Sequence, residues 1–263
     1  MIFSTQVVQT NVAPLHEHPC KQSQRVDEVL HGMAVFVKRK KKDWRFVSTP
    51  YRYEGWIHSS DLYMPSAYTL TDTNLLSQVH YVNIHGADVL AAPKVQATQL
   101  IFLTLGCIVY KVEDPVPHKA ESWSKIILAD GRIGYIRSDF ISLFPKSASR
   151  EAFCETAKMY LGTQYRWGGK TPLGIDCSGL CSMAYWLNGV VIYRDACIKS
   201  GFPIKEISPT RAQKGDLLFF PGHVGMMLDK TSMIHASEAN KTVKVEFLSE
   251  EWWSKLTAVG SIF

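Results

Sequence analysis

Cys177 stands in surroundings that suit a nucleophile. It follows a loop containing the breakers Pro172 and Gly174, and it precedes an apolar run, residues 180–187, that predicts a helix. A cysteine in the first turn of a helix feels the positive end of the helix dipole, which favours the thiolate, the form that attacks carbonyl carbon atoms. An isolated free cysteine is usually a small buried residue, so this position at a helix start is the argument for chemistry.

Two histidines downstream are candidate partners for the cysteine. His223 lies between two glycines in a strand-like run, and His235 lies in a second such run, residues 233–237. A cysteine, then a histidine, then a polar residue that orients the histidine is the order found in cysteine peptidases. The residue types and their order therefore predict a thiol peptidase.

The elements that must carry these residues form the last part of the chain. Residues 145–149 mark a boundary, and apolar residues at helical spacing predict a helix over 150–161, ended by Gly162. Strand-like runs follow at 223–228, 233–236 and 243–247. Helices packed on an antiparallel sheet predict an α+β domain over 146–263, with the nucleophile on a helix and the base on the sheet, as in papain-like enzymes.

The first half of the chain contains a weak internal repeat. Both copies carry a tryptophan-led strand, a glycine–aromatic–isoleucine strand and an Asp-Leu or Asp-Phe pair, at 44–62 and at 123–140. Regular short strands with turn signals predict small β-barrels, and the pattern resembles bacterial SH3-type domains. We expect two such SH3-like barrels, at residues 1–66 and 67–145.

The composition is that of a globular protein, because 46% of the 263 residues are hydrophobic and 20% are charged, which excludes a disordered chain. Part of the net charge of +5 is local, in residues 38–42. We expect this basic run to form a solvated hairpin loop between strands at 33–37 and 44–47. No interleaved aromatic motif accompanies it, so nucleic acid is not an expected partner.

Cellular location and cofactors are only weakly indicated. No segment approaches the roughly 20 apolar residues of a membrane span, and residues 1–12 lack the basic start and apolar core of a secretory signal. We expect a monomer that is cytoplasmic as the chain stands, with a secreted protein acting on the bacterial cell wall as the alternative. Cys181 is expected to be a buried neighbour of Cys177 rather than a metal ligand, and neither a metal nor an organic cofactor is expected.

The last part of the chain resembles the NlpC family of papain-like cell-wall endopeptidases. The matching segments are residues 165–169, 176–179, 215–220, 222–226 and 234–237. With two SH3-type domains in front, the whole chain is similar to the γ-D-glutamyl-L-diamino-acid endopeptidases of that family. The resemblance implies a cysteine endopeptidase that hydrolyses the bond between γ-D-glutamate and L-lysine or meso-diaminopimelate in peptidoglycan stem peptides, with a preference for a free N-terminal L-alanine.

The resemblance also implies the roles of the catalytic residues. It makes Cys177 the nucleophile and His223 the general base, with His235 in the third position, where it orients the imidazole of His223. Tyr165 matches a family tyrosine near the nucleophile and is implied to help hold the oxyanion, together with the backbone N–H of Cys177.

Substrate-binding residues are implied on both sides of the nucleophile. Asp176 and Ser178 are expected to line the cleft for the D-glutamate moiety. Asp195, in the pair Arg194-Asp195, is implied to bind the free α-amine of L-alanine, because an ammonium ion needs a fixed carboxylate in a partly dry cleft. From the first SH3-type domain, the candidates for this pocket are Tyr53 and Glu54.

Two other functions stay open from the sequence. The domain could be a papain-like amidase or acyltransferase that acts on another γ-glutamyl or acyl substrate. The chain could instead be a non-catalytic cell-wall-binding protein in which the SH3-type pair carries the function. The complete set of Cys177, His223 and His235 argues against the second alternative, because a scaffold needs none of them.

Overall fold

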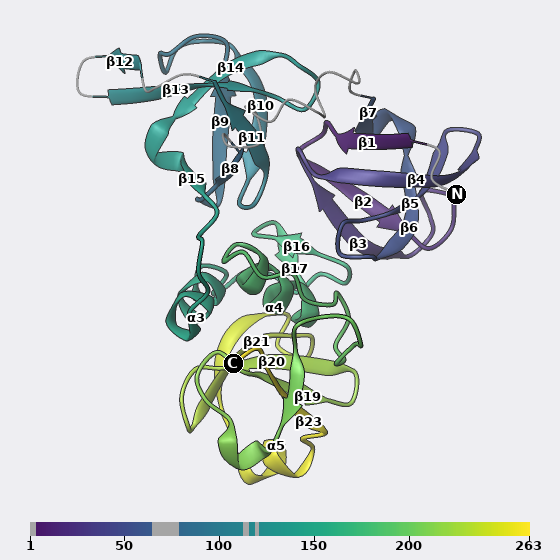
Figure 1. Ribbon diagram of the computed structural model, residues 1–263, viewed down its shortest axis with the longest axis vertical. Helices are drawn as coiled ribbons and strands as arrows, with labels where there is room; N and C mark the ends of the chain where they lie inside the picture. The colour runs from purple at the N-terminus through teal and green to yellow at the C-terminus, as the bar shows by residue number, and fades with distance from the viewer. Residues whose placement is uncertain (1–3, 65–78, 113–115, 119–120) are drawn as a thin grey trace. The chain divides into compact units, whose positions relative to one another are not determined.

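The computed structural model describes residues 4–64, 79–112, 116–118 and 121–263, and the chain divides into two compact units (Figure 1). The first unit, Met1–Phe144, is built of strands, and the second, Pro145–Phe263, combines helices with a sheet. The predicted order of a β-rich first half and an α+β second half is confirmed. The boundary predicted at residues 66–67 lies outside the described residues.

The first sheet of the N-terminal unit is antiparallel. Its strands are β1 (Ser4–Val8), β2 (Val12–His16), β3 (Arg25–Leu30), β4 (Ala34–Lys41), β5 (Trp44–Ser48), β6 (Glu54–His58) and β7 (Leu62–Tyr63). They pair in the order β3-β2-β6-β5-β4-β1-β7, and a short 3-10 helix, η1 (Ser59–Asp61), precedes the last strand.

The second sheet of this unit has the same plan. Its strands are β8 (Val79–Val82), β9 (Gly86–Leu90), β10 (Gln99–Thr104), β11 (Ile108–Lys111), β12 (Val116–His118), β13 (Glu121–Ile127), β14 (Ile133–Arg137) and β15 (Ile141–Leu143). They pair in the order β10-β9-β14-β13-β11-β8-β15, with β12 added beside β13, and η2 (Ser138–Phe140) again precedes the last strand.

The internal repeat predicted from the sequence is confirmed, because each strand of the first sheet has a counterpart at the same place in the second. The repeated glycine shows why the motif recurs. A Cβ atom at Gly55 would lie 2.6 Å from Leu15 Cγ, and one at Gly134 would lie 2.4 Å from Val89 Cγ1. In both copies, therefore, the strand after the hairpin must approach its neighbour more closely than a side chain allows.

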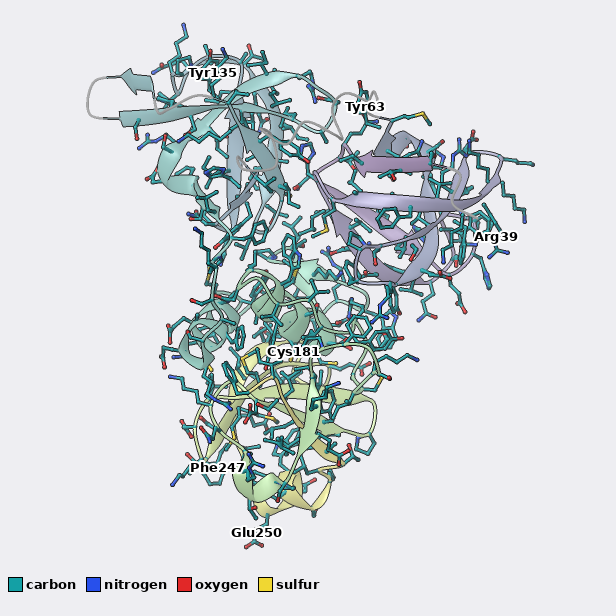
Figure 2. The ribbon with its side chains drawn as sticks, in the orientation of Figure 1. Arg39, Tyr63, Tyr135, Cys181, Phe247 and Glu250 are labelled. Atoms are coloured by element: carbon teal, nitrogen blue, oxygen red, sulfur yellow. The ribbon has the colours of Figure 1, made fainter. Side chains whose placement is uncertain are left out.

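The basic run was predicted to be a hairpin loop, and this is wrong for most of it. Strand β4 extends to Lys41, and Lys40 and Lys41 pair with Arg45 and Trp44 of β5. Backbone pairing does not depend on side-chain charge, so the cations stay on the strand with their side chains exposed. Arg39, which is labelled in Figure 2, adds a packing contact, because its guanidinium carbon lies 4.2 Å from the centroid of the Phe46 ring.

A buried histidine joins the two sheets of the first unit. The Nδ1 atom of His31 donates to the carbonyl of Gln9 at 3.0 Å, and its Nε2 atom accepts the backbone N–H of Ala129 at 3.1 Å. The backbone N–H of Ile108 donates to the His31 carbonyl at 2.8 Å. Burial lowers the pKa of His31 to about 4. The neutral ring therefore bonds to both repeats.

The second unit contains the predicted helices and antiparallel sheet. Its helices are α3 (Arg150–Lys158), α4 (Cys177–Trp186), α5 (Glu250–Ser254) and the 3-10 turn η3 (Pro209–Arg211). Its strands are β16 (Lys170–Thr171), β17 (Gly174–Ile175), β18 (Lys205–Ile207), β19 (Leu217–Phe220), β20 (His223–Met227), β21 (Ser232–Ser237), β22 (Thr242–Phe247) and β23 (Ala258–Ser261). The main sheet has the order β18-β23-β19-β20-β21-β22, and β16 pairs with β17.

Helix α3 begins where the sequence predicts, since Ser149 caps it by accepting the N–H of Ala152 at 3.1 Å. It ends at Lys158, earlier than the predicted Leu161, because from Tyr160 the backbone N–H groups reach back only three residues and form turns. The left-handed Gly162, with φ of 80°, then redirects the chain as expected.

The two faces of the main sheet pack against different helices. Leu217 and Phe219 of β19 line a pocket that Cys181 of α4 also lines. The alternate residue Phe220 belongs to a core cluster against which Trp252 of α5 packs. Strand alternation thus places α4 on one face and α5 on the other. Among the described residues, no helix combines the length and apolar character needed to cross a membrane.

Candidate active site

The predicted nucleophile lies at the first residue of α4. Asp176 caps this helix, because its Oδ1 atom accepts the backbone N–H of Gly179 at 2.6 Å. Cys177 follows directly and is only 6% exposed, and Cys181 one turn later is buried as predicted. The prediction that Cys177 starts a helix is confirmed.

A buried arginine braces the start of the helix. Arg194, in the loop after α4, donates from Nη1 to Asp176 Oδ1 at 3.0 Å and from Nη2 to Asp176 Oδ2 at 2.8 Å. Its Nη1 atom also donates to the hydroxyl of Ser178 at 2.7 Å. The N–H of Gly168 donates to Asp176 Oδ2 at 2.8 Å. The Asp176 carboxylate therefore holds the helix start and the glycine loop together, and its contact with substrate stays a prediction.

The thiol of Cys177 rests in its protonated form. Burial raises the pKa of Cys177 to about 11, and the neighbouring Asp176 carboxylate adds to this effect. The backbone N–H groups of Val224 and Ser178 donate to the sulfur and oppose the increase without reversing it. The helix dipole favours the thiolate, but desolvation opposes it here and keeps the pKa above that of a free thiol. The nucleophile needs a base.

The two predicted histidines form a hydrogen-bonded pair. The Nε2 atom of His223 and the Nδ1 atom of His235 lie 2.8 Å apart. Because Nε2 is engaged, the Nδ1 atom of His223 is the nitrogen that can serve the thiol. His223 adjoins Val224, whose N–H reaches the sulfur of Cys177. Burial, together with the nearby His235, lowers the pKa of His223 to about 4, so the base rests neutral.

A carboxylate and an indole complete the surroundings of the histidine pair. The Nε2 atom of His235 lies 2.8 Å from Glu246 Oε2 on the neighbouring strand β22. The ring of Trp252 from α5 lies 6.0 Å from the ring of His223 and 5.6 Å from that of His235, centroid to centroid. Neither residue was predicted from the sequence. A pairing of the strand-like runs 233–236 and 243–247 would have brought Glu246 near His235.

Tyr165 lies near the nucleophile, as the resemblance implies. It forms a parallel bridge with Ile175, two residues before Cys177. Burial raises the pKa of the Tyr165 phenol well above its ordinary value, and the Cys177 and Asp176 charges raise it further. The phenol therefore keeps its proton and can donate a hydrogen bond to an oxyanion. This role stays a prediction.

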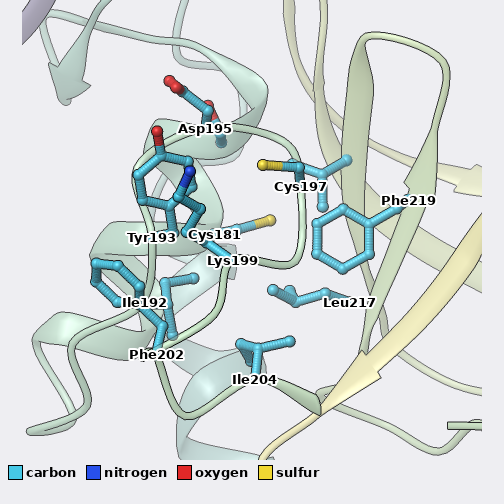
Figure 3. A pocket seen from close by; sticks show the side chains of 12 residues that line it. Cys181, Ile192, Tyr193, Asp195, Cys197, Lys199, Phe202, Ile204, Leu217 and Phe219 are labelled. Carbon is cyan, nitrogen blue, oxygen red and sulfur yellow. The ribbon is translucent and has the colours of Figure 1, made fainter. Parts of the chain in front are cut away.

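One pocket is lined by both Ser178, the residue after the nucleophile, and Asp195. It is bounded by α4, by the loop that precedes β18 and by strands β19 and β20. Figure 3 shows Tyr193 and Asp195 on one side of the pocket and Phe219 on the other. Asp195 is exposed to solvent, whereas most of the lining is apolar. The pocket therefore offers a carboxylate at the edge of an apolar space.

Comparisons with known proteins agree with this arrangement. Residues 162–260 match the NlpC/P60 family, and residues 9–63 match the bacterial SH3 domain. Dipeptidyl-peptidase 6 of Lysinibacillus sphaericus is 44% identical over 271 residues, which cover 98% of this chain and 99% of the relative.

Two further proteins are similar over different extents. Gamma-D-glutamyl-L-lysine dipeptidyl-peptidase of Bacillus cereus is 28% identical, across 46% of this chain and 40% of the relative. The crystal structure of an NlpC/P60 family protein from Bacillus cereus covers 97% of this chain and 98% of its own, with a TM-score of 0.82 and 20% identity. This structure therefore shares the fold along almost the whole chain.

Proposed function

The chain belongs to the NlpC/P60 family, and we propose that it hydrolyses the γ-D-glutamyl-L-diamino-acid bond of peptidoglycan stem peptides that carry a free N-terminal L-alanine. It is a cysteine peptidase, and peptidoglycan is its substrate polymer. One observation carries the finer proposal: Asp195 lines one pocket with Ser178 and Val224, which follow Cys177 and His223 directly in the chain. The name of the Bacillus cereus relative, with its γ-D-glutamyl-L-lysine bond, supports the same choice.

The neutral thiol and imidazole require a proton transfer at the moment of attack. As the sulfur of Cys177 bonds to the γ-carbonyl carbon of D-glutamate, its proton moves to Nδ1 of His223. The carbonyl oxygen becomes an oxyanion, which the phenol of Tyr165 and the backbone N–H of Cys177 are suited to stabilise. His223 then gives the proton to the leaving amine of the diamino acid. Water then attacks the γ-glutamyl thioester while His223 takes its proton. The C–S bond breaks, and His223 returns the proton to the sulfur of Cys177.

The pocket supports recognition of a short, free N-terminus. L-alanine has a small methyl group, which suits an apolar lining, and an ammonium group, which needs a fixed negative charge. Asp195 carries that charge at the edge of the pocket, next to Ser178 on the helix that starts with the nucleophile. We propose that Asp195 pairs with the ammonium group of L-alanine and that Ser178 and Asp176 border the D-glutamate site.

The test is mass spectrometry of products from L-Ala-γ-D-Glu-L-Lys and its meso-diaminopimelate analogue. We expect release of the dipeptide L-Ala-D-Glu by the wild-type protein and none by Cys177→Ala. Replacing the substrate by its N-acetyl-L-alanine form should reduce kcat/KM, and Asp195→Asn should reduce it for the free amine only. The matched control is Glu206→Gln, which removes an exposed carboxylate of β18 in the same unit.

The outcomes separate the alternatives. Hydrolysis retained in Cys177→Ala would contradict the nucleophile. Equal turnover of the free and N-acetylated peptides would contradict the proposed amine recognition and leave a broader endopeptidase. No cleavage of either peptide by the wild-type protein would direct attention to another γ-glutamyl or acyl substrate.

A further inference from the structure

The histidine pair continues into a carboxylate from a neighbouring strand. His223 Nε2 lies 2.8 Å from His235 Nδ1, and His235 Nε2 lies 2.8 Å from Glu246 Oε2. Both ring nitrogens of His235 are therefore engaged, one by the base and one by the carboxylate. A ring held at both nitrogens cannot flip without losing both bonds.

The register of the sheet explains how Glu246 reaches His235. In the β21–β22 pair, His235 stands opposite Lys244, so Glu246, two residues further along β22, lies on the same face as its diagonal neighbour. The intervening Val245 points the other way and is 44% exposed. Lys244 Nζ also lies 3.2 Å from Glu246 Oε2.

A glycine makes room for the pair on the other side. A Cβ atom at Gly225, two residues after His223 on β20, would lie 2.8 Å from Met233 Sδ and 3.4 Å from His235 Cβ. The absence of a side chain at this position lets β20 approach β21 closely enough for the two imidazoles to meet. The geometry of the pair is thus built by three strands, β20, β21 and β22.

The carboxylate of Glu246 remains ionised in this setting. Burial opposes its charge, but hydrogen bonds from His235 and Lys244 outweigh burial and hold the pKa of Glu246 below its ordinary value. An ionised carboxylate can only accept hydrogen bonds. His235 must therefore carry a proton on Nε2 and donate it to Glu246.

The remaining proton positions follow from that bond. Burial lowers the pKa of His235 even though Glu246 opposes this, so the ring is neutral and its Nδ1 carries a lone pair. That lone pair accepts a hydrogen bond from Nε2–H of His223. A neutral His223 with its proton on Nε2 has an unprotonated Nδ1, the nitrogen left for the thiol.

We infer that Glu246 is a positioning residue that sets the tautomer of both histidines and so leaves Nδ1 of His223 free to take the Cys177 proton. The effect on turnover rests on the proposed peptidase reaction, whereas the tautomers follow from the hydrogen bonds alone. Glu246 itself neither gains nor loses a proton: one proton moves from Sγ of Cys177 to Nδ1 of His223. In serine triads, a wrong tautomer of the base is costly in the same way.

The test compares the wild-type protein with Glu246→Gln, a change of nearly equal volume. Gln can donate or accept, so it no longer dictates which nitrogen of His235 carries the proton. We expect 15N imidazole chemical shifts of the full chain near pH 7 to show protonated Nε2 and bare Nδ1 on His223 in the wild type. We expect mixed tautomers in Glu246→Gln, with kcat reduced about 10- to 100-fold and KM little changed.

Controls keep the result interpretable. Glu206→Gln removes a carboxylate from another strand of the same sheet and should change neither the tautomer nor kcat. A wild-type His223 protonated on Nδ1, or an unchanged tautomer and kcat in Glu246→Gln, would overturn the inference. Since the 15N shifts need no substrate, the predicted tautomers in a wild-type protein that fails to cleave the peptides would support the inference and contradict only the proposed substrate.

Discussion

Arg194 holds both carboxylate oxygens of Asp176, with distances of 3.0 Å from Nη1 to Oδ1 and 2.8 Å from Nη2 to Oδ2. The two side chains are buried, at 2% and 8% exposure. Asp176 is also the residue that caps the helix of the nucleophile. The position of Cys177 therefore depends on an ion pair whose partner lies in the loop after that helix.

Removing one partner of this pair should be costly. Arg194→Met leaves a buried carboxylate without its counter-charge, and we expect the free energy of unfolding of the second unit to fall by about 3–5 kcal/mol. Urea denaturation measures this change. Arg211→Met, which removes an exposed arginine of η3, is the matched control and should change stability little. If both substitutions lowered the free energy of unfolding equally, the buried ion pair would stabilise the unit no more than an exposed arginine does.

The pH dependence of kcat/KM should reflect a resting pair that is neutral. Below the pKa of about 4 for His223, the base is protonated and cannot take the thiol proton. Above the pKa of about 11 for Cys177, the proton that must reach the leaving amine is lost. We expect a broad bell, whose limbs belong to the coupled Cys177–His223 pair.

Charged and titratable groups on both sides act on that pair. His235 and Glu246 act on His223, with Lys244 beside them, and Asp176 and Arg194 act on Cys177. Steady-state rates of dipeptide release, measured from below pH 4 upward, give the acid limb. A limb centred at the ordinary histidine pKa of 6.5 would contradict a base whose pKa is lowered by burial.

The first unit, Met1–Phe144, should lose stability in acid because of His31. Its folded pKa of about 4 lies below the model-compound value of 6.5, so only the unfolded chain binds a proton between these values. The contribution of neutral His31 to the free energy of unfolding is complete above pH 6.5. It falls by about 3 kcal/mol as the pH drops towards 4. Protonation of Nε2 would also break its bond with the N–H of Ala129.

The measurement is the midpoint of thermal unfolding between pH 7 and pH 4. We expect His31→Gln to lower the midpoint at pH 7 and to flatten its dependence on pH. His85→Gln, at an exposed position of the same unit, should keep the wild-type slope. If His31→Gln shows the full wild-type slope, the acid sensitivity arises elsewhere.

Gly225 should tolerate no side chain. The Cβ atom of Gly225→Ala would meet Met233 Sδ at 2.8 Å, and Met233 is fully buried, so the methionine or the strand must shift. We expect a loss of about 1–3 kcal/mol in the free energy of unfolding, as in other overpacked cores. Because His235 lies against the same atom, kcat should fall as well. Chemical denaturation and dipeptide release measure the two effects, and wild-type values of both would refute the predicted crowding.

Much of the architecture was predictable because its signals are local. The breakers before Cys177 and the apolar run after it define a helix start, and alternating runs around His223 and His235 define strands of one sheet. The repeated tryptophan and glycine patterns likewise predicted two sheets of the same plan. Each of these signals lies within a few residues of the element it predicts.

Charge placement was predicted less well than element type. The basic run 38–42 suggested a loop, but Lys40 and Lys41 continue the strand because their backbone groups find partners on β5. The helix start favours the thiolate of Cys177, but burial, which the sequence did not show, raises the pKa of that thiol to about 11. In both cases a local pattern does not reveal what surrounds a residue.

The sequence by itself determined that a cysteine begins a helix and that two histidines follow on strands, since residue type and short-range order suffice for both. Only the tertiary structure decided that Arg194 forms an ion pair with Asp176 and that Glu246 bonds to His235. The first contact spans a loop, and the second depends on the register of β21 with β22, where a shift of one residue would turn Glu246 to the other face. Tertiary structure also decided the protonation of the site, because the free energy of desolvation depends on every element packed around it.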